Sequence, residues 1–214
     1  MANKRIYKKI IVALDGMSAG RALKIAESLK DLVWGFKVND LLYADFKIIK
    51  KLKKYGKVFA DVKLYDIPNT VANSVQRLSK IGADIITVHA SGGTEMMRIA
   101  RKNSGKSKIM AVTILTSKKL KSEREVLNLA KEAIKAEVDG LVCSGHELKS
   151  INKLKGAKSF IKIVPGIRPI GFSKKDDQTR TMTAQEALKS GADYLVSGRP
   201  LTQSKNILRA LKSL

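Results

Sequence analysis

The stretch "KVFADVKLYDIPNTVANSVQRLSKIGADIITVH", residues 57–89, contains one complete unit of the pattern that predicts the fold. Its two apolar runs, at 57–64 and 84–89, lack strict polar alternation, which is typical of parallel strands covered on both faces. Between them, apolar residues recur at helical spacing on one face: Val71, Val75, Leu78 and Ile81. Gly82 supplies a C-terminal stop, so the stretch predicts strand, helix and strand.

Similar apolar runs recur along the chain, at residues 10–15, 34–39, 57–64, 84–89, 108–115, 140–144, 160–166 and 194–198. Because parallel strands need crossover connections, the segments between the runs are expected to be helices. Gly-Ala-Asp precedes two runs and a similar Val-Asp-Gly stands at a third, which indicates a reused turn. We therefore predict an α/β architecture, a (β/α)8 TIM barrel that forms a single domain over residues 1–214.

An open, doubly wound sheet is the competing architecture. Its dinucleotide-binding fingerprint, G-x-G-x-x-G, is missing after the first run, where the sequence reads "DGMSAG" at 15–20. The barrel therefore remains the expectation.

The chain is strongly basic, with 42 Lys and Arg against 19 Asp and Glu and a net charge of +23. Its lysines are spread over most expected helices, at 47–54, 102–108 and 149–158 among others, without interleaved arginine and aromatic residues. This spread favours a solvated basic surface that attracts anionic ligands over a specific nucleic-acid site, with nucleic-acid binding kept as the alternative.

The sequence predicts a cytoplasmic protein with no membrane partner. The run "IIVAL" at 10–14 is too short for a secretory signal, and no stretch reaches the roughly 20 apolar residues of a spanning helix. The single cysteine, Cys143, cannot form an internal disulfide. The stretch "FKIIKKLKKYGK" at 46–57 could lie on a membrane, but we expect a barrel helix with three residues packed inward: Phe46, Ile49 and Leu52.

Charged residues end four of the expected strands, at the rim where such barrels carry their active sites. They are Asp15, Lys37, Asp61 with Lys63, and Arg199. Because side chains alternate along a strand, Asp61 and Lys63 are expected to face the barrel mouth, where Lys37 can reach them. A salt-bridge network that only fixes strand register is the alternative, but the cost of desolvating these charges favours a functional site.

The loops after the seventh and eighth runs read "VPGIRPIG" at 164–171 and "VSGRPLTQS" at 196–204. Gly166 and Gly198 let backbone N–H groups approach an anion, and Arg168 and Arg199 offer forked donors, assisted by a helix N-terminus after Pro200. These features predict a phosphate site. The polar segment 171–181, which contains Gln178, is expected to be a lid, with a plain surface loop as the alternative.

The sequence resembles the orotidine 5′-phosphate decarboxylase family over its whole length. "DVKLYDIPNT" at 61–70 is similar to that family's D-x-K-x-x-D-I-P-N-T signature. The "PGIRP" and "DQTR" segments are similar to its phosphate loop, and "GRPLTQ" at 198–203 to its last loop. The resemblance implies decarboxylation of orotidine 5′-monophosphate to UMP and CO2 without a cofactor or metal.

The resemblance also implies roles for individual residues. Lys63 would donate the proton to the ring carbon that loses CO2, within an alternating set of charges that also contains Lys37, Asp61 and Asp66. The substrate-binding residues would be Asp15 and Lys37 for the ribose hydroxyls, Thr116 for the pyrimidine, and Arg168, Gln178, Gly198 and Arg199 for the 5′-phosphate. Asp66 and Thr70 would reach the partner's site in a homodimer.

Two positions depart from the family pattern. Asn39 stands where a glycine is common after the second-strand lysine, and Asp176 with Asp177 precedes Gln178 where a glycine is common before an acid and the glutamine. The nearest rival function is that of a magnesium-dependent sugar-phosphate decarboxylase or aldolase, which shares D-x-K-x-x-D but not the following "IPNT". A non-catalytic, nucleic-acid-binding barrel is the other rival.

Three further residues that invite functional claims are interpreted as structural. His89 ends the fourth run without a partner histidine and is expected to be a packed, hydrogen-bonded residue. His146 is expected at the surface, and Cys143 to behave as a small hydrophobe. The sequence shows no metal-ligand spacing.

Overall fold

The computed structural model describes residues 6–117, 122–172 and 180–214, and in it eight parallel strands close into a barrel in chain order. The strands are β1 (Ile10–Ala13), β2 (Gly35–Val38), β3 (Lys57–Leu64), β4 (Ile85–His89), β5 (Lys108–Val112), β6 (Gly140–Val142), β7 (Ile161–Val164) and β8 (Tyr194–Ser197). β1 pairs with β8, with Ile11 opposite Val196, which closes the sheet. The predicted TIM barrel is therefore confirmed, and the open sheet is excluded.

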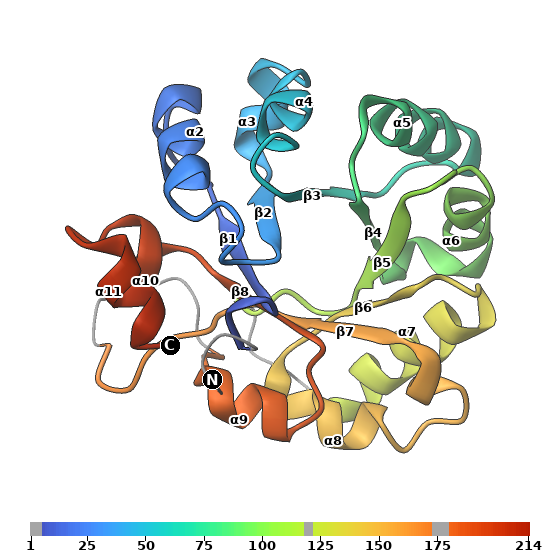
Figure 1. The fold of residues 1–214 in the computed structure, drawn as a ribbon. Coiled ribbons are helices and arrows are strands. Elements are labelled where there is room, and N and C mark those ends of the chain that lie inside the picture. Colours follow the sequence, from blue (N-terminus) through green and yellow to red (C-terminus); the bar gives the residue numbers. More distant parts are fainter. Residues whose placement is uncertain (1–5, 118–121, 173–179) are drawn as a thin grey trace.

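Helices surround the barrel on its outside (Figure 1). They are α2 (Ala19–Ser28), α3 (Asp40–Ala44), α4 (Ile48–Leu52), α5 (Pro68–Ile81), α6 (Gly93–Lys102), α7 (Glu123–Lys135), α8 (Leu148–Ile151), α9 (Ala184–Lys189), α10 (Arg199–Thr202) and α11 (Ile207–Lys212). Short 3-10 turns occur at η1 (Ala90–Gly92), η2 (Gly145–Glu147) and η3 (Ala157–Ser159).

The strands divide the apolar core into two clusters. A small cluster fills the barrel interior and consists of Ile11, Phe59, Ile85, Met110, Val112, Val142, Ile163 and Val196. A larger cluster lies between the strands and the helices, and it includes Ile10, Val12, Ala60 and Ile86. Neighbouring residues such as Ile10 and Ile11 enter different clusters because successive strand side chains point to opposite faces.

The crossover helix α5 forms as its sequence predicts. Val71, Val75 and Leu78 are buried, whereas Ile81 at the last turn is only partly buried. Gly82 ends the helix with φ of 112°, a left-handed conformation that glycine adopts without steric cost. Pro68 is the first residue of the helix. A backbone N–H at this position would have no acceptor within the helix, so proline loses no hydrogen bond there.

The expectation for the stretch 46–57 is partly wrong. Ile49 and Leu52 are fully buried on the inner face of α4, but the helix begins at Ile48 and Phe46 lies outside it. Phe46 is 41% exposed and lines a groove with Tyr43 and Arg77. The helical spacing failed there because the chain turns before α4, where Lys47 N–H bonds the Asp45 carboxylate.

Aspartates at the amino-terminal rim of the barrel join neighbouring strands. Asp84, Asp139 and Asp193 each accept a hydrogen bond from the second residue of the preceding strand, at 2.7, 2.9 and 2.8 Å. Each aspartate also donates its own N–H to the carbonyl of that same residue, at 2.8 to 3.0 Å. The repeated turn therefore forms the same pair of hydrogen bonds to the preceding strand at all three positions. We call this pair of bonds the clasp. At the β1–β2 junction Trp34 N–H bonds Ile10, and the indole packs on Tyr194.

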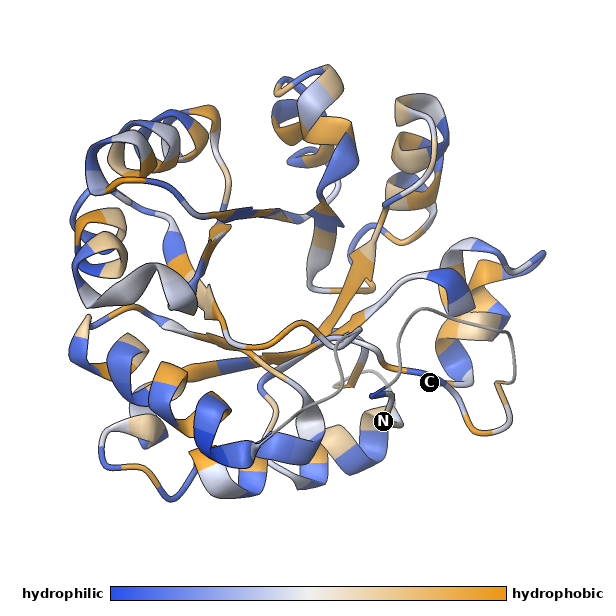
Figure 2. Ribbon diagram, turned by 180° about the vertical axis from the view of Figure 1, so that it is seen from behind, coloured by the Kyte–Doolittle hydropathy of each residue, from blue (hydrophilic) through white to orange (hydrophobic). Residues whose placement is uncertain are grey.

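The strands are largely hydrophobic, and the surrounding helices mix hydrophobic and hydrophilic residues (Figure 2). The lysines of 47–54, 102–108 and 149–158 are exposed, in accord with a solvated basic surface. In the described part of the chain, no helix is long and apolar enough to cross a membrane.

Candidate active site

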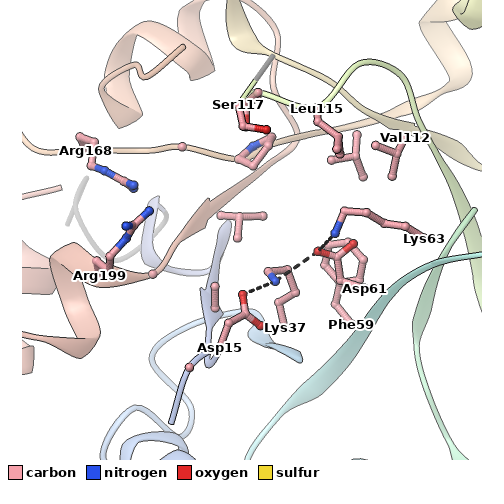
Figure 3. A pocket seen from close by; sticks show the side chains of 18 of the residues that line it. Asp15, Lys37, Phe59, Asp61, Lys63, Val112, Leu115, Ser117, Arg168 and Arg199 are labelled. Atoms are coloured by element: carbon pink, nitrogen blue, oxygen red, sulfur yellow. Dashed lines mark hydrogen bonds and ion pairs between the residues drawn. The ribbon is translucent and has the colours of Figure 1, made fainter. Parts of the chain in front are cut away.

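A cavity of about 510 Å³ opens at the carboxyl ends of the strands. This volume lies in the range of small-molecule sites. Its charged lining residues come from several strands and the loops after them: Asp15, Lys37, Asp61, Lys63, Arg168 and Arg199. The lysines and aspartates occupy one side of the cavity and the two arginines the other (Figure 3).

Four of these side chains form one continuous chain of opposite charges. Lys37 Nζ lies 2.5 Å from Asp15 Oδ2 and 3.2 Å from Asp61 Oδ2. Lys63 Nζ lies 2.8 Å from the same Asp61 oxygen. We call Asp15, Lys37, Asp61 and Lys63 the charged array (Figure 3).

The centre of the charged array is buried, and its ends are more exposed. The side chains of Lys37 and Asp61 are 11% and 9% exposed, against 28% for Lys63 and 40% for Asp15. Burial acts to raise the pKa of Asp61, but the ammonium groups of Lys37 and Lys63 outweigh it and hold that pKa below its ordinary value. For Lys37 burial acts to lower the pKa, while Asp61 and Asp15 together raise it above its ordinary value.

An irregularity in β3 places Lys63. Ala60 pairs with Ile86 and Leu64 with Val88, so two extra residues are accommodated in β3 opposite Thr87. Lys63 adopts φ of 50°, a left-handed conformation that is uncommon for a residue with a Cβ. Simple strand alternation, which we used to predict the direction of Lys63, does not hold across this bulge.

Thr87 on β4 stabilises the bulge with one hydroxyl group. It accepts a hydrogen bond from the Lys63 N–H at 2.9 Å and donates to Asp61 Oδ1 at 3.0 Å. The sequence analysis missed Thr87. A hydroxyl in the middle of a buried apolar strand, beside a strand with two charges, was the available signal.

Asn39 connects the end of β2 to β3. Its Nδ2 donates to the Asp61 carbonyl at 2.6 Å, and its φ of −127° is one that any residue can adopt. The glycine common at this position in the family is therefore not needed by the local backbone. Nearby, Gly16 N–H bonds the Asp40 carboxylate at 2.9 Å, which ties the loop carrying Asp15 to α3.

The opposite side of the cavity is suited to an anion. Arg168 and Arg199 both extend into it, and Gly166, Gly198 and Gln203 also line it. Gly198 packs closely on β1, because a Cβ there would lie 3.3 Å from the Ala13 Cβ. Helix α10 begins at Arg199, one residue before Pro200, and is only four residues long, so the expected helix dipole is small.

Thr116 lines the cavity between these two sides, together with Leu115 and Ser117. Asp66 and Thr70 do not line it. Asp66 is exposed and bonds the Ile67 N–H, and Thr70 borders a separate groove on the outer surface. Gln178 lies outside the described residues, as do Asp176 and Asp177.

The remaining polar candidates are placed as follows. His89 does not line the cavity, and its ring meets Tyr65 edge-on at 6.2 Å. His146 is exposed, with Nε2 3.2 Å from the Thr181 carbonyl oxygen. Cys143 is buried but reaches the cavity wall, and burial raises the pKa of its thiol. Within the described ranges, His, Cys, Asp and Glu side chains form no group of three that could hold a metal ion.

A family model described as "Orotidine 5'-phosphate decarboxylase / HUMPS family" matches residues 8–214. Curated relatives extend over nearly the whole chain. An orotidine 5'-phosphate decarboxylase of Aquifex aeolicus is 43% identical, with 96% of this chain and 98% of the relative covered. One of Saccharophagus degradans is 38% identical, with 96% and 93% covered.

Solved structures show the same likeness in three dimensions. Orotidine 5'-phosphate decarboxylase from Lactobacillus acidophilus superimposes with a TM-score of 0.81 at 33% identity, with 96% of both chains covered. The enzyme from Pyrococcus horikoshii gives a TM-score of 0.78 at 28% identity, with 95% of both chains covered.

Proposed function

Because the chain belongs to the orotidine 5′-phosphate decarboxylase / HUMPS family, we propose that it decarboxylates orotidine 5′-monophosphate to UMP and CO2. This reaction is the last step of de novo pyrimidine nucleotide synthesis, and the proposal includes a cytoplasmic, cofactor-free, single-domain enzyme. One observation carries it: the charged array and the arginine pair occupy opposite sides of one cavity. That arrangement suits a substrate with a reacting ring at one end and a phosphate at the other.

In the proposed complex, Arg168, Arg199 and the backbone at Gly198 bind the 5′-phosphate. Guanidinium groups suit this task because their forked donors match phosphate oxygens. Gln178 is proposed as a further phosphate ligand. Asp15 and Lys37 bind the ribose hydroxyls, since Asp15 is the most exposed member of the charged array and Lys37 is paired with it. Thr116 contacts the pyrimidine from the loop after β5.

Loss of CO2 leaves a carbanion on the pyrimidine ring, and no cofactor is invoked to delocalise it. Stabilisation must then come from a fixed positive charge close to that carbon. The Lys63 ammonium is held by Asp61 at 2.8 Å and extends into the cavity, so it is in place before the charge develops. It interacts more strongly with the localised carbanion than with the dispersed charge of the substrate, which lowers the barrier.

Lys63 then donates a proton to the same carbon, which completes the exchange of carboxylate for hydrogen. Asp61 lies beside the departing carboxylate in this scheme. Repulsion between the two anions raises the energy of the bound substrate, as a contribution secondary to carbanion stabilisation.

The decisive test is an ultraviolet absorbance assay with orotidine 5′-monophosphate in the presence of EDTA. The proposal expects turnover in EDTA and its loss in Lys63→Ala. Loss of wild-type activity in EDTA would instead favour the magnesium-dependent sugar-phosphate decarboxylases or aldolases.

We also propose a homodimer in which Asp66 and Thr70 complete the partner's site. Large apolar side chains are exposed on the surface near these two residues: Tyr43, Phe46, Tyr65 and Ile67. Tyr43 and Phe46 line a groove of about 350 Å³ together with Thr70, Asn73 and Arg77. Exposed apolar surface of this kind is typical of protein interfaces. Asp66 would then extend the charged array from across the interface.

Complementation between two inactive variants tests this assembly. Lys63→Ala and Asp66→Ala are each expected to be inactive alone. In a mixed dimer, one site would combine an intact Lys63 with the partner subunit's intact Asp66, so an equal mixture should regain about a quarter of wild-type activity. If Asp66 serves its own chain, the mixture stays inactive.

A further inference from the structure

Arg180 is not among the residues that line the cavity, and its guanidinium makes three contacts. Its Nη2 donates to the carbonyl oxygens of Ile114 and Leu115, each at 3.2 Å. Its Nη1 pairs with Glu147 Oε1. The Arg180 and Glu147 side chains are 13% and 3% exposed, so the pair lies almost entirely out of water.

Glu147 is itself fixed to the end of β6. Its second oxygen, Oε2, accepts the Ser144 N–H at 3.1 Å. Burial raises the pKa of Glu147, with the charge of Arg180 acting in the opposite direction. The carboxylate thus connects a rigid strand end to the arginine.

The two carbonyl groups held by Arg180 belong to the loop after β5. Ile114 and Leu115 line the cavity, as do the next two residues, Thr116 and Ser117. A shift of the carbonyls at 114 and 115 would therefore shift this wall. One nitrogen of a buried cation thus bonds two successive carbonyls of this loop, and the same guanidinium is anchored on Glu147.

The backbone beyond Arg180 contacts the other side of the cavity. Met182 accepts the Arg168 N–H at 3.0 Å, and its own N–H donates to Gly166 at 3.4 Å. Residues 180–182 therefore touch both the wall formed by 114–117 and the backbone of the anion side. The side chain of Arg180 bonds the wall at 114–117, and the main chain of Met182 bonds the backbone of the anion side.

A purely stabilising ion pair is the simpler interpretation. Buried pairs of this kind often contribute little net stability, because desolvation offsets their attraction. In addition, Arg180 Nε is buried with no hydrogen-bond partner among the described residues. The guanidinium is thus oriented so that it bonds the loop carbonyls and Glu147, although this leaves its Nε without an acceptor among the described residues.

We propose that Arg180 is a positioning residue for the pyrimidine side of the cavity, acting through the carbonyls of Ile114 and Leu115 with Glu147 as its anchor. The inference rests on the proposed function, which assigns the pyrimidine to the wall containing Thr116. Arg180 itself is not expected to touch the substrate.

Two ligands separate this role from a general effect on the fold. UMP uses the anion side, the proposed ribose ligands and the wall at 114–117, whereas ribose 5-phosphate lacks the base and does not depend on that wall. Isothermal titration of both ligands is compared for wild type, Arg180→Lys, Arg180→Ala and Glu147→Gln. The matched control is Arg98→Ala, which removes the exposed Arg98–Glu95 pair on α6.

Arg180→Ala should weaken UMP binding by about ten-fold or more, because small displacements of a binding wall have large effects. Ribose 5-phosphate binding should change by less than about two-fold, since Arg168 and Arg199 keep their backbone contacts. Arg180→Lys and Glu147→Gln should show the same pattern more weakly, and Arg98→Ala should show neither change. Added guanidinium should partly restore UMP binding in Arg180→Ala.

Equal losses for the two ligands, or no loss for UMP, would overturn the positioning role. If Arg180→Ala fails to fold, the Arg180→Lys and Glu147→Gln comparison decides the question by the same criterion. A wild-type protein that binds UMP but does not turn over orotidine 5′-monophosphate would refute the proposed function alone. The binding comparison would still decide the role of Arg180.

Discussion

The two rims of the barrel both carry aspartates paired with basic side chains, but they use them differently. At the amino-terminal rim, Asp84 accepts a hydrogen bond from the Val58 N–H and pairs with Lys53 at 2.8 Å. At the carboxyl-terminal rim, Asp61 accepts from Lys37, Lys63 and Thr87, three side chains. Asp84 therefore provides a hydrogen-bond acceptor for the backbone, whereas Asp61 provides one for polar side chains.

This difference separates stability from function. An aspartate that bonds a strand N–H supplies a partner that the backbone would otherwise lack at this rim of the barrel. The charged array replaces nothing of that kind, and its buried members must be desolvated. A cluster that is costly to desolvate at one rim, beside a repeat that satisfies the backbone at the other, supports the proposal that the cluster is retained for chemistry.

The largest effect should follow from Lys63→Ala at the carboxyl-terminal rim. We expect kcat to fall by about 10³-fold or more, because the variant loses both the fixed charge and the proton donor. The melting temperature should change little, since the Lys63 side chain is partly exposed. Absorbance assays and thermal melts measure both quantities. A residual rate within ten-fold of wild type would contradict a catalytic role for the carboxyl-terminal rim.

Asp61→Asn should have the next largest effect. The shape is kept, but the charge that holds both lysines is lost, so we expect kcat to fall by about 10²-fold. Steady-state kinetics give the value, and circular dichroism at matched concentration checks the fold. An unchanged kcat would mean that Asp61 belongs with the structural aspartates.

Asp139→Ala tests the amino-terminal rim. The variant loses the acceptor for the Ile109 N–H and the ion pair with Arg101, so unfolding free energy should fall by about 2 kcal/mol. Asp139→Asn keeps an acceptor oxygen and should lose less than half as much. Urea unfolding measures both, and kcat should equal that of wild type. A loss of kcat without loss of stability would reverse the comparison.

Acid should weaken the carboxyl-terminal rim through Asp61. The folded-state pKa of Asp61 lies below its ordinary value of 3.8, so its contribution to stability is complete above about pH 4. That contribution is lost as the pH falls through the folded-state pKa. Urea unfolding at pH 7, 4 and 3 should therefore show wild type losing stability that Asp61→Asn does not lose. Parallel pH curves for the two proteins would contradict the assignment.

Lys53→Ala should have the smallest effect. Its ion pair with Asp84 is 38% and 24% exposed, so the loss of unfolding free energy should be about 0.5 kcal/mol. The difference from wild type should shrink in 1 M NaCl, which screens exposed charges. A loss as large as that of Asp139→Ala would show that the cation, and not the backbone bond, carries the clasp.

The barrel was predictable because strands that are buried on both faces can be recognised from their local sequence. Runs such as 84–89 and 108–115 contain few polar residues, and helices such as α5 show their apolar face and their glycine stop. The ends of the strands were predictable for the same reason, since Asp15, Lys37 and Asp61 interrupt apolar runs.

Features that depend on a distant partner were not predictable. The bulge at Lys63 is stabilised by Thr87 in the next strand, and no rule of alternation within β3 reveals it. The Gly-Ala-Asp repeat was visible, but its hydrogen bonds reach the preceding strand 26 to 31 residues away. The roles of Asp66 and Thr70 require a second subunit and stay predictions, as does that of Gln178.

Under the proposed mechanism, the left-handed backbone at Lys63 lowers stability at the residue that turnover needs. A residue with a Cβ is strained by about 1 kcal/mol or more at φ of 50°, and glycine would relieve that strain. Directed evolution that selects only for survival at high temperature should therefore enrich glycine at position 63 and discard the amine. A library selected in that way should yield more stable but inactive barrels, unless growth without added uracil is also required.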